Sequence, residues 1–434
     1  MGAVLRHGMI WVLLSVCLPF GLSAQLSCGL AWHQVYIPGS LPVSPDLLLG
    51  QASAFDSRRG VAVLFGGNNP VTGVLHTGDT WEWNRTAWAN RKPLVHPSAR
   101  KNAAMAYDSD RGVCVLFGGG TNIFQHEIPF NDTWEWDGTV WTLRRSNDPS
   151  GGNRPPPMDT PIMAYDSFRK RTVLIGSAER AGSEINPVTR TWEWDGEVWT
   201  VHDRLTSASP APPPRIQSAM AYDPVRRVTV VFGGTAFRGG LLHDTWVWDG
   251  ANWTQVGKNT FPAARDQHSM AFDLRRQVMV LFGGSDGDIL NLPEGTFEWD
   301  GTSWSPSPSV VYGLPPRRLH LMWYENDEQR LIVFGGIVSS QSPGGPFQHK
   351  ILDEMREARP PGRWVDFNYP GQPSLAPPGN FYTPFNTLAA AVASAAPGCT
   401  LILKPGSLAE TITISKPLTL EAYRGPATVG RASP

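Results

Sequence analysis

Three absences limit what this chain can be. It has no excess of positive charge, because 37 Lys and Arg residues stand against 38 Asp and Glu residues. A nucleic-acid surface needs clustered Lys and Arg to neutralise phosphates, so no nucleic-acid partner is expected. Beyond the N-terminus there is no apolar run of about twenty residues, so the mature chain is not expected to span a membrane. No Gly-rich phosphate loop opens a helix either.

Cysteine is scarce as well. Four cysteines occur in 434 residues, and one of them lies in the apolar N-terminal segment. The remaining Cys28, Cys114 and Cys399 are an odd number without metal-ligand spacing, so they predict no metal site. Free buried thiols are expected, and a Cys28–Cys114 disulfide formed in an oxidising compartment is the alternative.

The N-terminus has the pattern of a targeting segment. Arg6 precedes the apolar run GMIWVLLSVCLPFGL, and Leu22-Ser23-Ala24 supplies small residues for cleavage. Residues 1–24 are therefore predicted to be a cleaved signal peptide, and the mature protein is predicted to be secreted or periplasmic.

A repeat dominates the rest of the chain. Its signature is Phe-Gly-Gly, preceded at a constant interval by an aromatic residue and an acid, as in Tyr107-Asp108. The copies begin at Phe65, Phe117, Phe232, Phe282 and Phe334, with a degenerate Ile175-Gly176-Ser177 between the second and the next. Successive copies lie about 50 to 58 residues apart, a period typical of propeller blades or solenoid coils.

Each repeat has the pattern of short strands. In the second unit, AAMAYD, VCVLFGG, DTWEWD and VWTLR are four runs rich in aromatic and β-branched residues, separated by turns. A four-stranded antiparallel sheet of this size cannot bury both of its faces alone, so the units must pack face to face in a ring. The predicted fold is an all-β propeller.

Tryptophan recurs within the unit, as in NDTWEWDGTVWT over residues 131–142. Side chains alternate along a strand, so Trp134 and Trp136 share one face, and Asp137-Gly138 supplies a hairpin turn before Trp141. We expect these rings to fill the wedge between blades. An exposed ladder of Trp rings that stacks on sugars is the alternative.

These features resemble the kelch repeat. The resemblance rests on the hydrophobic run ending in Gly-Gly, the aromatic strand, the Trp after a turn, and the Arg-x-x-His lead-in at Arg265/His268 and Arg317/His320. It covers residues 50 to about 365. It implies six, or seven, four-stranded antiparallel blades, as in the central domain of galactose oxidase. For His268 and His320 we expect a structural hydrogen bond rather than catalysis.

The two ends of the propeller, predicted to span residues 25–367, are less regular. Trp32-His33-Gln34-Val35 resembles Trp253-Thr254-Gln255-Val256, which predicts that an N-terminal outer strand helps to close the ring. Unit six has a long insertion, and its last strand is predicted to be displaced to Trp364-Val365-Asp366-Phe367.

Function is expected on one face of the ring. Because strands alternate in direction, the nearly constant first-to-second and third-to-fourth turns share one face, and the variable second-to-third loops and blade connections share the other. Variable loops on a rigid scaffold are typical of a binding site. The candidate binding residues on these loops are His76, Gln125, His126, Glu127, Arg180, Arg238, His243, Asp286, Asp288 and His349.

The expected role is therefore binding of, or scaffolding for, a protein or polysaccharide partner. No catalytic residue, metal or cofactor is predicted, because the loop histidines show no ligand spacing. The alternative is a carbohydrate-active or galactose-oxidase-like enzyme with its site on the same face. The oxidase branch of the family needs Tyr and His copper ligands and a Cys cross-linked to a Tyr, which cannot be matched residue by residue onto this chain.

The C-terminal part has a different pattern. After a Pro- and Gly-rich linker at 368–380, Thr383 as N-cap and Pro384 at the first helical position predict an Ala-rich helix that stops at Gly398. The strands TLILKPGS, ETITIS and LTLEAY follow. Residues 381–434 thus resemble the capping helix and first coils of a right-handed parallel β-helix of the pectate-lyase type. We expect this segment to be incomplete, from a truncated gene product or docked on the propeller or a second copy, and we expect no lyase activity from it.

Overall fold

The computed structural model divides into two compact units. The larger unit comprises Trp32–Ser307 and Gly313–Ala358, and the smaller unit comprises the remaining N-terminal, 308–312 and C-terminal segments. The structure describes residues 3–5, 31–35, 45, 48–69, 76–123, 126–148, 154–178, 188–202, 211–237, 239–257, 261–288, 292–293, 295–307, 314–341, 347–352, 355–359, 363–365, 385–394, 400–404, 406–408, 418–422 and 427–429.

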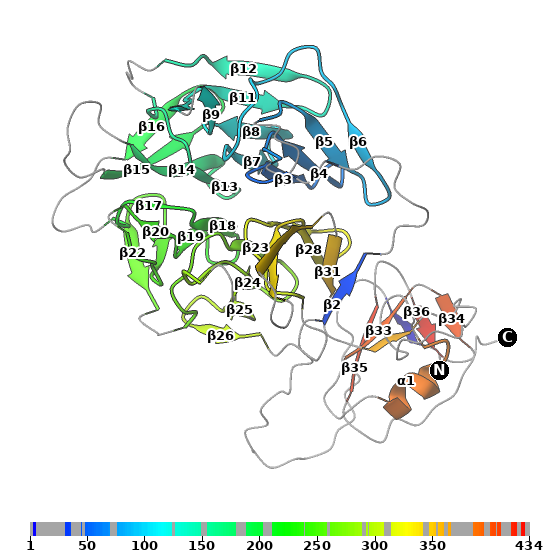
Figure 1. Cartoon of the computed structure of the whole chain (residues 1–434). Coiled ribbons are helices and arrows are strands. Elements are labelled where there is room, and N and C mark those ends of the chain that lie inside the picture. Colours follow the sequence, from blue (N-terminus) through cyan, green and yellow to red (C-terminus); the bar gives the residue numbers. More distant parts are fainter. Residues whose placement is uncertain are drawn as a thin grey trace. The chain divides into compact units, whose positions relative to one another are not determined.

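The larger unit is a β-propeller of six four-stranded antiparallel blades, which confirms the predicted fold class (Figure 1). The first strands of neighbouring blades contact one another around the ring axis. From inside to outside, the strands are β3 (Ala52–Asp56), β4 (Val61–Phe65), β5 (Thr80–Trp83) and β6 (Trp88–Asn90) in blade one; β7 (Ala104–Asp108), β8 (Val113–Phe117), β11 (Thr133–Trp136) and β12 (Trp141–Arg145) in blade two; β13 (Ile162–Asp166), β14 (Arg171–Ala178), β15 (Val188–Trp194) and β16 (Trp199–His202) in blade three; β18 (Ala219–Asp223), β19 (Val228–Phe232), β21 (Thr245–Trp248) and β22 (Trp253–Val256) in blade four; β23 (Ser269–Asp273), β24 (Val278–Phe282), β25 (Thr296–Trp299) and β26 (Trp304–Pro306) in blade five; and β27 (Leu321–Glu325), β28 (Arg330–Phe334), β31 (Met355–Arg359) and β2 (Ala31–Gln34) in blade six.

Blade six joins the two ends of this unit. Its outermost strand is the N-terminal β2, which lies beside β31, and the Val35 N–H donates to the Met355 carbonyl at 3.0 Å. Trp32 packs against Phe282 of blade five with 5.4 Å between ring centroids. The prediction of an N-terminal outer strand is therefore confirmed.

The predicted displacement of the last strand of unit six is wrong. Trp364 and Val365 belong to β32 (Arg363–Val365), which pairs in parallel with β33 (Thr400–Leu403) of the smaller unit. The physical reason is that β2 already occupies the outer edge of β31, so no fifth strand is needed to cover it.

The tryptophans lie in the wedges between blades, as expected. Trp136 is only 1% exposed, and its Nε1 donates to a Glu82 carboxylate oxygen in blade one at 2.8 Å. Trp141 Nε1 donates to Thr80 Oγ1, also in blade one, at 2.8 Å. The same Trp-to-Thr bond links the pairs Trp199–Thr133, Trp253–Thr191, Trp304–Thr245 and Trp32–Thr296. These rings are buried, so the alternative of a sugar-stacking ladder is wrong.

A network of Asp, Arg and Glu side chains closes the turn end of blades one, two, three and five. In blade two, Asp108 accepts the backbone N–H groups of Asp110 and Arg111 at 3.1 and 3.0 Å, and Arg111 Nε at 2.7 Å. Arg111 Nη1 then donates to Glu135 in β11 at 2.6 Å. We call this Asp-Arg-Glu set the clamp. It recurs as Asp56–Arg59–Glu82, Asp166–Arg169–Glu193 and Asp273–Arg276–Glu298 in blades one, three and five.

Blade four has an incomplete clamp. Val247 stands where the other blades have Glu, and Arg226 forms its ion pair with Asp223. In the next blade, Trp299 Nε1 consequently has no hydrogen-bond partner among the described residues.

The Gly-Gly signature lies at the opposite end of the blades, where neighbours approach closely. Gly283 has a φ of +67°, and an added Cβ would collide with the carbonyl oxygen of Arg317 in blade six. Gly284 N–H donates to that same oxygen at 2.9 Å. A residue without Cβ is required here both for the positive φ and for the inter-blade contact.

Three short two-stranded antiparallel sheets extend the blades at this end, and in the second of them β18 and β19 separate the two strands in sequence. They are β9 (Gly120–Ile123) with β10 (His126–Pro129), β17 (Arg215–Ile216) with β20 (Thr235–Ala236), and β29 (Ile337–Gln341) with β30 (Phe347–Ile351). Cys114, inside β8, is a free cysteine, and burial raises the pKa of its thiol well above the usual value. Cys28 and Cys399 lie outside the described residues.

The smaller unit contains one helix and short strands. β32, β33 and β35 (Thr419–Ala422) form a parallel sheet, and β34 (Gly406–Leu408) pairs in parallel with β36 (Ala427–Val429), which pairs antiparallel with β1 (Ala3–Leu5). The parallel pairing is what successive coils would give, and the resemblance to a pectate-lyase β-helix stays a prediction. No helix among the described residues is long and apolar enough to cross a membrane.

The helix α1 (Leu388–Ser394) begins later than the sequence predicts. Thr387 Oγ1 accepts the Ala390 N–H at 3.2 Å, so Thr387 is its N-cap. Thr383, Pro384 and Gly398 lie outside the described residues.

Candidate functional site

A pocket lies on the ring axis, at the end where the blade connections arrive. Its volume is about 180 Å³, and all six blades contribute residues from the start of their inner strands. We call it the axial pocket. Its lining comprises Gly50, Gln51, Asn102, Ala103, Thr160, Pro161, Ile162, Gln217, Ser218, Gln267, His268, Leu319, His320 and Leu321. This is the face of the ring that the sequence predicts to carry the function.

The rim of the axial pocket has an unusual backbone. One residue in each of five blades has a positive φ, namely Gly50 at 67° and Asn102, Gln217, Gln267 and Leu319 at 56°. This conformation costs roughly 1–2 kcal/mol for a residue with a Cβ. Backbone bonds between blades offset part of that cost, from Asn102 to Gly50 at 2.6 Å, from Gln267 to Gln217 at 3.0 Å and from Leu319 to Gln267 at 3.0 Å. Strained positions of this kind cluster at functional sites in proteins.

The rim side chains are held in order by a chain of hydrogen bonds. Arg318 Nη1 donates to Gln267 Oε1 at 2.7 Å, which directs the Gln267 amide nitrogen toward Gln217, where it donates to Oε1 at 3.3 Å. The NH₂ group of Gln217 ends the chain and has no partner among the described residues. The Asn102 amide likewise has no hydrogen bond among them. Two carboxamides with free hydrogen-bonding capacity are thus available at the rim, and the chain of bonds orients that of Gln217.

His268 and His320 occupy equivalent places in blades five and six. They are 5% and 3% exposed, and each ring packs edge-on against the preceding blade's Phe, with centroids 5.5 Å apart for Phe232 and 5.3 Å for Phe282. Neither ring has a hydrogen bond of ordinary geometry among the described residues. The main chain of Phe232 and Asp266 faces the His268 ring, and the main chain of Phe282 faces the His320 ring. The structural hydrogen bond stays a prediction, and the packing against Phe232 and Phe282 is what the structure shows.

Both imidazoles are neutral near pH 7. Burial, with the charge of Arg265 as the next cause, lowers the pKa of His268 to about 3. Burial also lowers the pKa of His320 well below its usual value, and the charge of Arg317 acts in the same direction. The polar groups in the lining of the axial pocket are therefore uncharged, and they lie beside the apolar side chains of Ala103, Pro161, Ile162, Leu319 and Leu321.

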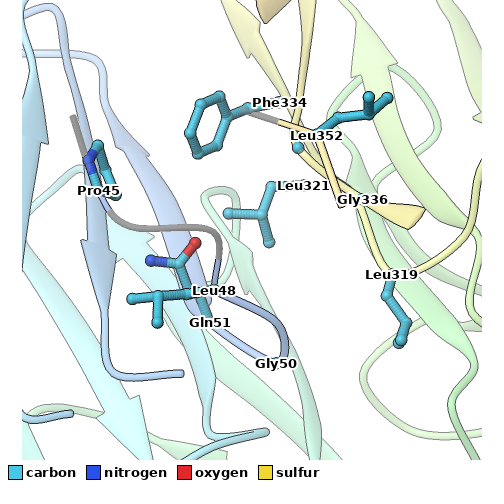
Figure 2. A pocket seen from close by; sticks show the side chains of 10 residues that line it. Pro45, Leu48, Gly50, Gln51, Leu319, Leu321, Phe334, Gly336 and Leu352 are labelled. Atoms are coloured by element: carbon cyan, nitrogen blue, oxygen red, sulfur yellow. The ribbon is translucent and has the colours of Figure 1, made fainter. Parts of the chain in front are cut away.

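A second, smaller pocket lies beside the first, between blades six and one. Its volume is about 10 Å³, which accommodates at most a single water molecule. Gln51 lines both pockets, and its Nε2 is buried without a partner among the described residues. Figure 2 shows Pro45, Leu48, Gly50 and Gln51 on the blade-one side and Leu319, Leu321, Phe334, Gly336 and Leu352 on the blade-six side.

None of the loop residues predicted as binding candidates is among the described residues that line the axial pocket. His76 is half-buried and His243, Asp286 and Asp288 are exposed; none of these four lines the axial pocket. His126 and Glu127 lie in β10, and His349 lies in β30. Gln125, Arg180 and Arg238 lie outside the described residues. Their role in binding stays a prediction.

The described residues contain no cluster of side chains that would hold a metal ion. No group of three or more His, Cys, Asp or Glu side chains among them is arranged to hold a metal ion. The axial pocket has two His residues in its described lining but no Tyr or Cys. These residues do not fit the Tyr and Cys chemistry of the oxidase branch, and no step through copper is derived.

Comparison with known proteins leaves the family of this chain open. No protein-family model matches the chain, and no curated protein matches it. A solved structure titled "Structure of YjhT" is similar over 72% of this chain and 99% of its own, with 13% sequence identity and a TM-score of 0.49.

Proposed function

We propose that this protein is a binding module that holds an uncharged polar group of a protein or glycan partner in the axial pocket. One observation carries the proposal: all six blades line the pocket, and the polar groups among the lining residues are carboxamides, hydroxyls and neutral imidazoles. Such groups both donate and accept hydrogen bonds, which suits the hydroxyl and amide groups of a sugar or a peptide.

The size of the pocket limits what enters it. Pockets for drug-sized ligands have volumes of roughly 300–1,000 Å³, whereas this one has about 180 Å³. A single terminal sugar or one amino-acid side chain is therefore the proposed occupant. The variable loops on the same face would extend the contact to the rest of the partner. Export from the cytoplasm, which the N-terminal segment predicts, would bring the module to such partners.

The test uses the full chain and two rim variants. Gln217→Ala and Gln267→Ala remove carboxamides from the rim, and the matched control is Gln277→Ala. Gln277 also has a positive φ, 57°, but lies in the turn at the opposite end of blade five, so its replacement carries the same backbone cost. The probes are neutral monosaccharides with and without an acetamido group, observed by ligand-detected NMR.

We expect the rim variants to weaken probe binding roughly tenfold, because each loses a hydrogen bond of about 1–2 kcal/mol in the complex. The control should bind as the unaltered protein does. Equal binding by all three variants, or no binding by the unaltered protein, would contradict the axial pocket as the sugar site.

The alternative of a carbohydrate-active enzyme on this face has less support. No Asp, Glu or Cys is among the described residues that line the axial pocket, so a carboxylate pair or a thiol nucleophile is absent from that lining. If the unaltered protein converts one of the probes chemically and Gln217→Ala abolishes that conversion, the enzyme is favoured over the binding module.

A further inference from the structure

A buried arginine recurs at the pocket end of several blades, and blade two shows its complete set of partners. Arg100 donates from Nη1 and Nη2 to the two carboxylate oxygens of Asp132 at 2.6 and 2.8 Å, and from Nη1 to the Gly118 carbonyl at 2.9 Å. Trp134 Nε1 donates to Asp132 at 2.7 Å. Blade four repeats the set with Arg215, Asp244, Gly233 and Trp246.

Blade five keeps the arginine but not the carboxylate. Arg265 donates to the carbonyls of Gly283 and Ala263 at 3.0 and 3.1 Å, as its counterparts do. Gly295 stands in the place of the Asp, and Phe297 stands in the place of the Trp that would donate to it. Arg265 Nη2, which binds a carboxylate in blades two and four, has no hydrogen bond or ion pair among the described residues. The guanidinium carbon lies 4.8 Å from the centre of the Phe297 ring.

The Arg265 charge is poorly compensated. The residue is 1% exposed, and burial lowers the pKa of its guanidinium to about 10. The charge of Asp286 opposes this shift only in part, and Asp286 itself is exposed. A buried charge without a partner is costly, so an anion that reached Arg265 would be stabilised there.

The position of the missing carboxylate is open. Gly295 is exposed, and a Cβ added to it would have only the Phe297 ring within 4 Å among the described residues, at 3.4 Å. Gly295 also has a φ of +111°, a backbone conformation that residues with a Cβ rarely adopt.

We propose that blade five is a carboxylate-binding site, in which Arg265 receives a carboxylate of a ligand where blade two holds its own Asp132. A carboxylate is the proposed class because its planar pair of oxygens matches the fork of a guanidinium, as the two complete sets in this same molecule show. The site is independent of the sugar or side-chain binding proposed for the axial pocket.

The test measures thermal unfolding of the full chain with added acetate at constant ionic strength, with chloride and neutral acetamide as references. At acetate tenfold above its dissociation constant, Tm should rise by about 2 °C, with no rise from chloride or acetamide. Glucuronate and propionate in separate arms present the carboxylate on a sugar or on an aliphatic chain. A larger shift with either supports the proposal and identifies the source.

Arg265→Met is the decisive variant, because blade three has Met158 at the equivalent position and the fold accepts it there. The variant should fold and lose the acetate response. Arg227→Ala, which removes an exposed arginine in the turn at the opposite end of blade four, should keep it. An acetate response that persists in Arg265→Met, or its absence from the unaltered protein, overturns the proposal. If Arg265→Met does not fold, a crystal structure of the unaltered protein in acetate decides: a carboxylate on Nη2 supports the site and its absence overturns it.

Discussion

The two ends of the propeller use their repeats differently. At the turn end, the clamp of Asp108, Arg111 and Glu135 has the same residue types in blades one, three and five. At the axial-pocket end, the backbone register also repeats, but the rim residues change from blade to blade: Gly50, Asn102, Thr160, Gln217, Gln267 and Leu319. The clamp acts within one blade and its neighbour, and it keeps its residue types in four of the six blades. The rim side chains meet only in the assembled ring, so no single blade requires a particular residue type at that position.

The largest expected effect concerns the clamp. Glu135→Val removes the acceptor for Arg111, for Arg144 at 2.8 Å and for Trp194 at 2.9 Å, and places in blade two the residue that blade four has naturally. Leaving these buried or half-buried donors unpaired should lower the free energy of unfolding by about 3 kcal/mol. Urea unfolding followed by tryptophan fluorescence measures it. A loss below about 1 kcal/mol would mean that the clamp does not hold this end of the ring.

The reverse substitution is the control for that prediction. Val247→Glu should complete the clamp of blade four and give Trp299 Nε1 the acceptor that it lacks. We expect a gain of up to about 1 kcal/mol in the free energy of unfolding. A loss of stability in both variants would show that the two blades differ in more than this side chain.

An intermediate effect is expected from pH at the pocket end. In the unfolded chain His268 regains a pKa near 6.5, whereas in the folded protein it is about 3. Below about pH 6.5 the unfolded state therefore binds a proton that the folded state does not, and stability falls as pH is lowered. At pH 5 the loss from this residue should be about 2 kcal/mol, and His320 should add to it in the same direction.

Urea unfolding at about pH 7 and about pH 5 measures this dependence. His268→Ser reproduces blade four, where Ser218 holds the equivalent place, and should reduce the difference between the two pH values. An unchanged pH dependence in that variant would assign the effect to other groups.

The smallest effect on stability is expected at the rim. Gln217→Gly relieves the cost of a positive φ, roughly 1 kcal/mol, but gains a similar amount of entropy in the unfolded chain. The free energy of unfolding should therefore change by less than about 0.5 kcal/mol, while sugar binding weakens as in Gln217→Ala. A loss above about 1 kcal/mol in urea unfolding would show that the rim stabilises the ring as the clamp does.

Much of the fold could be predicted because its causes are local and repeated. The Gly-Gly pairs, the turn acids and the tryptophans each satisfy a requirement of every blade, so the same pattern recurs along the chain. The match of Trp32 to Trp253 identified the closing strand for the same reason. The prediction for Trp364-Val365 was wrong because a short strand with an aromatic residue has the same sequence pattern in a propeller blade and in the smaller unit. Only its pairing with β33 shows that it belongs to the smaller unit.

The axial pocket could not be predicted in the same way. Its residues lie far apart in sequence and meet only around the axis, so Asn102, Gln217 and Gln267 each look like an ordinary polar residue before a strand. The sequence prediction followed loops that vary in length. The usable signal was a residue that varies in type at a fixed offset before each Gly-Gly. For His268, the lead-in motif predicts a structural position, and the structure buries its ring against Phe232.

The composition of blade six has a consequence for how the protein is made. Its outer strand, β2, precedes every other strand of the ring in sequence, whereas its partner β31 ends at Arg359. β2 has no pairing partner until the strands of the five other blades and β31 have been synthesised. Joining such distant segments carries a loop-closure cost that earlier pairings avoid. We therefore expect ring completion to follow the pairing of the other strands, and the edge of β31 to stay open to strand-edge association until β2 has paired with it.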